Sequence, residues 1–258
     1  MGSAKALIAT GYGINCEQES KYAFEKSGGI ADIVHINSII ENPKILEDYG
    51  LLFFPGGFSF GDDLGSGRVL ANKLRYRLYD QMKEFVNSKK LVIGVCNGFQ
   101  VLVKLGLLPI PDFQQHATLM GNDSGKFEDR WVFLKVNQKS PCIFTREIDY
   151  LLLPVRHGEG KFFASDEVLK MMHEKNLVTL QYVDRYGRVT TTYPDNPNGS
   201  LDGIAGICDE SGRIFGLMPH PEAFNITQNC PYWTFGGIKE AMGLRVFKNA
   251  VKYLTETL

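Results

Sequence analysis

The sequence predicts an α/β protein with an open, mostly parallel sheet flanked by helices. Over the first 105 residues, short apolar runs alternate with longer amphipathic stretches, which is the rhythm of a parallel sheet with right-handed crossovers. A glycine-flanked cysteine joins one apolar run directly to a helical stretch. No repeat, low-complexity segment or linker interrupts the chain, so we expect a single domain over residues 4–258.

In the first half, each buried strand is followed by a loop and then by a helical or polar segment. Leu70, Leu74, Leu78 and Met82 repeat every four residues, which predicts a long helix with one buried stripe. We expect strands at 4–10, 31–36, 51–54 and 91–95, and helices at 17–26, up to about 88, and at 97–105. Ligands of such sheets bind beyond the carboxyl ends of the strands, so the loops after these strands should share one edge.

The second half is richer in extended segments. A Glu-Ser-Gly turn at 210–212 separates two apolar runs and predicts a hairpin. We expect extended segments at 116–121, 131–136, 150–155, 177–183, 204–209 and 213–217, and helices at about 166–173 and from Gly236-Gly237 to about 255.

Composition excludes several classes of protein. The net charge of -1 gives no reason to expect a nucleic-acid or membrane partner, and no apolar run approaches the roughly 18 residues of a membrane span. The five cysteines are scattered and include no C-x-x-C pair, which argues against a disulfide framework or a zinc site. The N-terminus has no signal-peptide pattern, so we expect a cytoplasmic protein.

Cys96 is the candidate nucleophile. It stands between Gly94 and Gly98 in G-V-C-N-G, the cysteine counterpart of the nucleophile elbow G-x-S-x-G. The positive end of the following helix favours a thiolate over a thiol. The alternative is a buried core cysteine, which is what a lone cysteine after an apolar run usually is.

His220 and Glu222 are the candidate base and its orienting acid. They are two residues apart in M-P-H-P-E-A-F, and each proline favours an extended conformation in the residue before it. Residues two apart in an extended segment point to the same side, so the carboxylate can lie beside the imidazole. The alternative is a surface histidine on a proline-rich loop.

Two backbone N–H groups are candidates for an oxyanion hole. Gly57 ends the Pro-Gly-Gly turn after the third strand, and Asn97 directly follows Cys96. A tight turn without function is the alternative for Pro-Gly-Gly. His157 lies among glycines in a segment that we expect to be a loop, where a substrate-side role and an ordinary loop histidine are both open. The chain has neither G-x-x-x-x-G-K-[ST] nor G-x-G-x-x-G, so we find no nucleotide site.

Together these motifs resemble the triad-type, or class I, glutamine amidotransferases, which have a flavodoxin-like fold. Within that group the chain is similar to the glutaminase subunits or domains of phosphoribosylformylglycinamidine synthase. The resemblance covers nearly the whole chain and is carried, in order, by 11-GYGINCE-17, 55-PGGFSFGDDLGSG-67, 94-GVCNGFQVL-102, 155-VRHGEGKF-162 and 218-MPHPEAF-224.

The resemblance implies a glutaminase that attacks L-glutamine with Cys96, through a thioester, with His220 as base and Glu222 as its orienter. It implies that the glutamine is held by Gly56, Gln100, His157, Gly158 and Glu159. It further implies a large synthetase subunit and a small bridging subunit as partners. ATP and magnesium belong to the synthetase, which converts formylglycinamide ribonucleotide to the amidine in purine biosynthesis, so no cofactor is expected in this chain.

Two departures from the family pattern bear on partners. The loop from Leu64 to Arg68 differs from the usual one, and the 225–237 segment, with Tyr232 and Trp233, is longer than expected. That segment could be a dimer contact, a synthetase contact or a packed loop. Three other functions stay open: an amidotransferase for another acceptor, a related α/β cysteine hydrolase, and a non-catalytic regulatory subunit.

Overall fold

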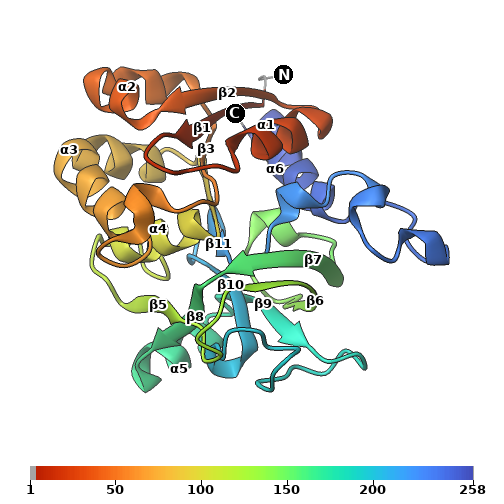
Figure 1. The fold of residues 1–258 in the computed structure, drawn as a ribbon. Coiled ribbons are helices and arrows are strands. Elements are labelled where there is room, and N and C mark those ends of the chain that lie inside the picture. Colours follow the sequence, from red (N-terminus) through yellow and green to blue (C-terminus); the bar gives the residue numbers. More distant parts are fainter. Residues whose placement is uncertain (1–3, 258) are drawn as a thin grey trace.

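The computed structural model of the chain describes residues 4–257 and contains one large sheet with helices on both faces (Figure 1). Its nine strands lie in the order β2-β1-β3-β4-β11-β10-β9-β6-β7. Their bounds are β1 Lys5–Thr10, β2 Ile30–His35, β3 Leu51–Phe54, β4 Leu91–Val95, β6 Glu128–Val136, β7 Tyr150–His157, β9 Val178–Val183, β10 Ile204–Cys208 and β11 Ile214–Leu217. A separate pair joins β5 (Ala117–Gly121) to β8 (Glu159–Ala164).

The large sheet has a parallel half and an antiparallel half. Strands β2, β1, β3, β4 and β11 are parallel to one another, whereas β10 pairs antiparallel with β11 and with β9, and β6 pairs antiparallel with β9 and β7. The α/β class is therefore confirmed, and so is the predicted hairpin, which is formed by β10 and β11. All residues of β3 and β4 are buried, as expected for parallel strands that are covered on both faces.

Helices cover the two faces of the parallel half. Figure 1 shows α3 and α4 on one side of the strands and α1 and α6 on the other. The helices are α1 Glu17–Lys26, α2 Ile36–Glu41, α3 Arg68–Asn87, α4 Asn97–Leu105, α5 Asp166–Glu174 and α6 Gly243–Thr257. The predicted stripe of α3 is buried, and every residue of α4 is buried because α3 packs over this helix.

The structure corrects three predictions of local structure. His157 was placed in a loop, but it ends β7, and β8 begins at Glu159 only two residues later. The last helix begins at Gly243 rather than directly after Gly236-Gly237. The short helix α2 was not predicted, because its six residues lack a full amphipathic period.

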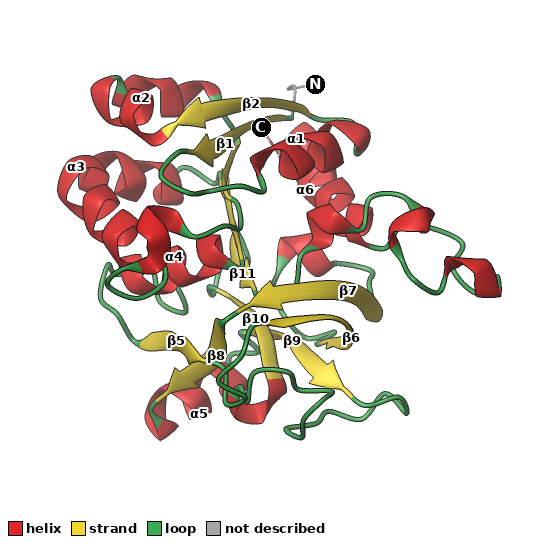
Figure 2. Ribbon diagram, in the orientation of Figure 1, coloured by secondary structure: helices red, strands yellow, loops and turns green. Residues whose placement is uncertain are grey.

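The 225–237 segment extends away from the body of the molecule between β11 and α6 (Figure 2). It contains two single-turn 3-10 helices, Thr227–Asn229 and Trp233–Phe235. Trp233 is 47% exposed and Phe235 is 81% exposed, so these rings do not belong to the core. Among residues 4–257, no helix has both the length and the apolar character that a membrane crossing requires.

Candidate active site

Cys96 occupies a strained joint between β4 and α4. Its φ of 51° and ψ of -106° are rare for a residue with a side chain. The joint is possible only with its two glycines. A Cβ on Gly98 would lie 1.8 Å from the Phe54 carbonyl oxygen, and one on Gly94 would lie 2.5 Å from the Gly98 oxygen. The glycine spacing that predicted the elbow thus reflects close backbone packing of the start of α4 against β3 and β4.

His220 and Glu222 lie together just beyond β11, the neighbour of β4. Nδ1 of His220 is 2.6 Å from Oε1 of Glu222, and both side chains are buried. The His220 N–H donates to the Pro154 carbonyl at 2.8 Å, which attaches the loop to β7. His220 is extended, but Pro221–Ala223 forms a 3-10 turn. The carboxylate therefore reaches the ring through a turn and not through the extended segment that we predicted.

The surroundings of His220 favour its charged form. Burial of the ring opposes protonation, but the Glu222 carboxylate and then the Cys96 and Cys16 thiols outweigh it, so the pKa of His220 lies well above its ordinary value. Among the described residues, its Nε2 atom has no hydrogen-bond partner. A buried imidazole with one nitrogen on a carboxylate and the other free, close to a thiol, can accept the thiol proton and hold it.

The Pro-Gly-Gly turn after β3 is braced by the loop after β1. The Asn15 N–H donates to the Gly56 oxygen at 3.2 Å, and the Phe58 N–H donates to the Gly13 oxygen at 2.9 Å. Between these bonds Gly57 has a φ of +144°, where a Cβ would lie 2.6 Å from the Gly13 oxygen. Asn97 begins α4, and the first N–H groups of a helix have no partner within it. Because β3 and β4 are adjacent, Gly57 and Asn97 follow neighbouring strands.

Gly56 packs against His220, the candidate base, and does not face open space. A Cβ at this position would lie 2.7 Å from Cε1 of His220 and 3.2 Å from Sγ of Cys16. The absence of a side chain therefore allows the imidazole and the Cys16 thiol to approach the turn. Cys16 directly precedes α1, but its side chain makes no capping hydrogen bond to this helix.

Both polar atoms of the Gln100 side-chain amide are hydrogen-bonded within the protein. Its Nε2 donates to the Glu159 carbonyl at 2.5 Å, and its Oε1 accepts from Nδ2 of Asn97 at 2.9 Å. The same Asn97 amide donates to Asp62 Oδ1 at 3.1 Å. Gln100 therefore joins α4 to the start of β8, so it positions the 157–159 segment rather than pointing a free amide at a ligand.

Asp62, Ser66 and Lys104 complete this network, and sequence reasoning missed all three. The Ser66 N–H donates to Glu159 Oε2 at 3.3 Å, and the Lys104 ammonium donates to the Ser66 carbonyl. Burial raises the pKa of Asp62 and lowers that of Lys104. Lys104 lies in the mostly apolar stretch that forms α4, where every residue is buried. A lysine within such an apolar stretch is a signal in the sequence that indicates a buried polar partner.

The His157 ring is buried and is hydrogen-bonded within the protein. Its Nδ1 lies 3.0 Å from Oδ1 of Asn122, and burial, followed by the nearby charge of His220, lowers its pKa to about 3. The ring is therefore neutral at pH 7. It packs beside Gly160, where a Cβ would lie 2.6 Å from the ring. His157 is thus a buried strand residue and not the ordinary loop histidine that was one of the two alternatives.

Two cavities meet at Cys96. One, of about 210 Å³, extends towards Ser66, Gln100 and Glu159. The other, of about 300 Å³, extends towards Cys16 and His220. Both are lined by the same five residues, Gly57, Phe58, Cys96, Phe127 and Arg156. The nucleophile candidate, the base candidate and the predicted 157–159 segment therefore face one continuous region of the surface.

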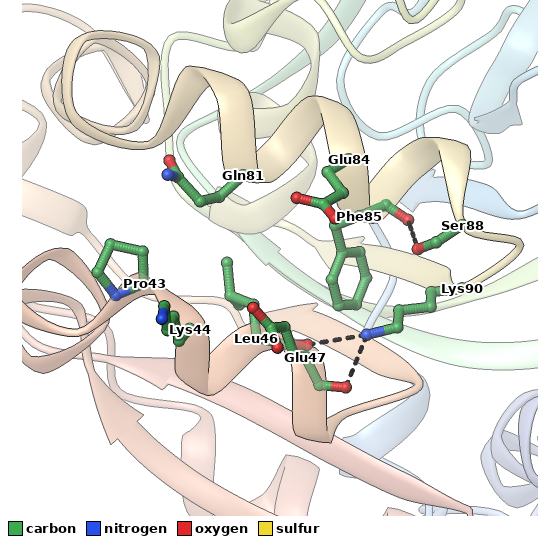
Figure 3. Close-up of a pocket in the computed structure, with 9 residues that line it drawn as sticks. All are labelled: Pro43, Lys44, Leu46, Glu47, Gln81, Glu84, Phe85, Ser88 and Lys90. Carbon is green, nitrogen blue, oxygen red and sulfur yellow. Dashed lines mark hydrogen bonds between the residues drawn. The ribbon is translucent and has the colours of Figure 1, made fainter.

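A third hollow lies far from this chemistry. Figure 3 shows it between the Pro43–Asp48 turn and the end of α3. Its volume is about 280 Å³. Two lysines, Lys44 and Lys90, line it. The Lys90 ammonium donates to the carbonyl oxygens of Leu46 and Glu47, both at 3.0 Å. The residues that line it include no cysteine or histidine.

Comparisons with known proteins agree on one family. The sequence profile of the CobB/CobQ-like glutamine amidotransferase domain matches residues 3–254. Phosphoribosylformylglycinamidine synthase subunit PurQ from Dehalococcoides mccartyi is 49% identical over 255 residues, covering 98% of both chains. The subunit of the same name from Methanococcus maripaludis is 43% identical over 267 residues, again with 98% of each chain covered.

The chain is also similar to solved structures. A chain in the structure of PurLQS from Thermotoga maritima superimposes with a TM-score of 0.73 at 31% identity, covering 98% of this chain and 100% of that one. A glutamine amidotransferase from the same organism, at 16% identity and a TM-score of 0.56, shares the fold.

Proposed function

Since the chain belongs to the family of CobB/CobQ-like glutamine amidotransferase domains, we propose that it is the glutaminase subunit of a phosphoribosylformylglycinamidine synthase. The observation that carries the proposal is the arrangement around His220. One ring nitrogen contacts Glu222 at 2.6 Å, the other has no protein partner among the described residues, and the ring lines the same cavity as Cys96.

The reaction proceeds in two steps. His220 takes the Cys96 proton, the thiolate attacks the side-chain amide carbon of glutamine, and the same proton goes to the departing ammonia. Water, deprotonated by His220, then cleaves the glutamyl thioester and releases glutamate. The N–H groups of Gly57 and Asn97 stabilise the oxyanion in both steps, and each such donor is worth about 3 kcal/mol.

Substrate binding uses the charges at the two cavities. A free amino acid carries one carboxylate and one ammonium group, and Arg156 and Glu159 supply a cation and an anion at the edge of the Cys96 region. We assign the contacts with the glutamine to Arg156, Glu159 and the backbone of Gly158. Gln100 and His157 have a positioning role, because their hydrogen bonds hold the 157–159 segment in place.

The ammonia serves a synthetase partner. The relatives are named as subunits of a synthase, and one solved neighbour is an assembly called PurLQS, so we assign this chain a large ATP-using subunit and a small third subunit as partners. ATP and Mg²⁺ belong to the large subunit. Formylglycinamide ribonucleotide is the acceptor that receives the ammonia.

The first experiment is mass spectrometry after reaction with a glutamine-mimicking electrophile, with and without glutamine. We expect one adduct, on Cys96, that glutamine suppresses. Cys16 is the internal control, because it faces the same cavity but is not next to the elbow. Labelling of Cys16 in preference to Cys96, or labelling that glutamine does not suppress, would contradict the assignment of the nucleophile.

The acceptor needs a second experiment. The chain is combined with the large and small synthase subunits, and the formation of formylglycinamidine ribonucleotide is measured with glutamine or with ammonium salt as the nitrogen source. The Cys96→Ala variant should lose the glutamine-dependent reaction and keep the ammonia-dependent one. Glutaminase activity without any amidine product in the presence of the partners would indicate a different acceptor.

A further inference from the structure

Lys73, near the start of α3, contacts the segments that follow three neighbouring strands. Its ammonium donates to the Tyr12 hydroxyl at 2.8 Å and to Oδ1 of Asn37 at 3.1 Å. It also lies 4.4 Å from the centroid of the Tyr12 ring and 5.8 Å from that of Phe60. Tyr12, Asn37 and Phe60 follow β1, β2 and β3, which are parallel. One cation therefore connects three segments at the edge of the sheet that carries Cys96.

The two aromatic rings beside this ammonium stack on each other. The centroids of the Tyr12 and Phe60 rings are 4.2 Å apart, and the ring planes differ by 17°. The Phe60 N–H donates to the Tyr12 carbonyl oxygen at 2.6 Å. Both residues have a positive φ, of 57° and 56°, which a residue with a side chain keeps only where its surroundings hold it. Because a cation is attracted to the face of an aromatic ring, Lys73 stabilises this strained pair.

The segments after β1 and β3 pair as a short antiparallel ribbon, formed by residues 12–15 and 56–60. Two backbone hydrogen bonds, of 2.9 and 3.2 Å, join the segments on either side of Gly57, and neither uses the Gly57 N–H. The Ser59 N–H donates to Oδ1 of Asn97 at 3.2 Å. The ribbon therefore holds Gly57 and contacts Asn97, the two residues whose N–H groups we assign to the oxyanion.

We propose that Lys73 is a positioning residue for the oxyanion hole, because it holds the Tyr12–Phe60 stack at one end of the ribbon around Gly57. The inference rests on the proposed glutaminase function. Among residues 4–257, those that line the two cavities at Cys96 include neither Lys73 nor Tyr12, so Lys73 acts through the ribbon. A donor stabilises the oxyanion only when it is directed at the place where that oxyanion forms. Lys73 therefore contributes to the transition state and not to the binding of glutamine.

The first test is kinetic, with the chain combined with the large and small synthase subunits. Lys73→Met keeps a long apolar side chain and removes the ammonium. We expect kcat for glutamine hydrolysis to fall by roughly 10–100-fold, as for a small displacement of a catalytic group, with KM unchanged. Lys73→Arg keeps a cation and N–H donors beside the rings and should restore most of kcat. Lys83→Met, at an exposed lysine of the same helix, is the control.

Two reagents separate the oxyanion hole from the nucleophile. The Cys96 thiol adds to the aldehyde carbon of L-glutamate γ-semialdehyde and its proton passes to the aldehyde oxygen, which then lies in the oxyanion hole. Iodoacetamide alkylates the same thiol by displacing iodide and forms no such oxygen. Lys73→Met should bind the semialdehyde roughly 10–100-fold more weakly, the same factor as in kcat. Its rate of alkylation at Cys96 should equal that of the wild type.

Amide hydrogen exchange detects the loosened ribbon without any turnover. In Lys73→Met, exchange in peptides that cover residues 11–16 and 56–62 should be roughly tenfold faster, because hydrogen bonds from a charged group are lost. Peptides from β6 and β7 should keep their wild-type protection. Tyr12→Phe keeps the stacked ring and removes the hydroxyl, so its smaller loss of kcat should not add to that of Lys73→Met.

Three results would overturn the proposal: unchanged exchange in both segments of the ribbon, a higher KM without a loss of kcat, or equal losses of semialdehyde binding and of alkylation at Cys96. Thermal unfolding of Lys73→Met and Tyr12→Phe establishes that a lower kcat does not come from a lost fold. A wild-type complex that neither hydrolyses glutamine nor binds the semialdehyde would contradict the proposed function itself, and the oxyanion role of Lys73 with it. Exchange in the ribbon would still show whether Lys73 holds the two segments.

Discussion

Nδ1 of His220 lies 2.6 Å from Oε1 of Glu222, and the two side chains are only 3% and 1% exposed. In such a dry environment a charged pair interacts strongly, and either partner left alone would be costly. The pair therefore holds the ring orientation and the charge of the base together, and this relationship can be tested directly.

Glu222→Gln should lower kcat/KM for glutamine by roughly 10²–10⁴-fold, because the imidazolium loses its counter-charge and its orienting partner. The raised pKa of His220 stabilises the fold fully below the ordinary histidine pKa of about 6.5, and this contribution disappears as the pH rises through the higher folded-state value. The stability difference between wild type and variant should therefore shrink with increasing pH. Kinetics and urea unfolding measure both effects, and Glu25→Gln on the exposed face of α1 is the control.

Gly98→Ala should disrupt the elbow. The added Cβ would lie 1.8 Å from the Phe54 oxygen, and neither backbone segment can retreat without breaking the β3–β4 pairing. We expect a loss of about 3 kcal/mol or more in the free energy of unfolding, together with loss of glutaminase activity. Gly121→Ala is the matched control, because no atom lies within 4 Å of a Cβ there. Equal stability of the two variants would contradict our account of the joint.

Gln100→Leu should raise KM for glutamine more than it lowers kcat. The change leaves the Glu159 carbonyl and the Asn97 amide without their partner, so the 157–159 segment loses its anchor. Stability should fall by about 1–3 kcal/mol. Gln115→Leu also removes an amide that donates to a backbone carbonyl, that of Ala117, and it should leave KM unchanged. An effect of Gln100→Leu on kcat alone would assign this residue to the chemical step.

The neutral, buried His157 should make the fold sensitive to acid. Its pKa of about 3 lies below the unfolded value of about 6.5, so between these values the unfolded chain binds more protons and stability falls as the pH is lowered. His157→Gln, which can keep a bond to Asn122, should flatten this slope in unfolding experiments from pH 7 to pH 3. His173→Gln, at an exposed histidine of α5, should not. If stability fell with pH equally in wild type and in His157→Gln, the acid sensitivity could not be assigned to His157.

The 225–237 segment should contribute to assembly with the synthase. Trp233 and Phe235 are exposed there, and Asn225 at its base donates to the Glu222 carbonyl at 2.7 Å. The double change Trp233→Ala and Phe235→Ala should weaken binding of the large subunit by about 30-fold, as for an aromatic hot spot worth about 2 kcal/mol. Calorimetric titration of the chain with the large subunit measures this loss of affinity. Tyr76→Ala, at an 83% exposed ring on α3, is the control, and equal effects would remove the segment from the interface.

The sequence by itself determined the parts of the protein whose causes are local. The glycines around Cys96 predicted the elbow because a side chain there collides with neighbouring backbone. Apolar runs predicted the buried strands β3 and β4, and a four-residue repeat predicted the buried face of α3. His220 and Glu222 are two residues apart, so their pairing needed only a short segment of chain.

Only the tertiary structure decided which distant groups meet. The strand order brings the loops after β1, β3, β4 and β11 to one edge, so Cys16 reaches His220 across most of the sequence. The contacts from Gln100 to Glu159 and from Lys104 to Ser66 depend on how α4 packs among its neighbours. The direction of the His157 ring follows from burial beside Asn122 and not from its glycine neighbours. These contacts span tens to hundreds of residues, and the periodicity of a single segment carries no information about them.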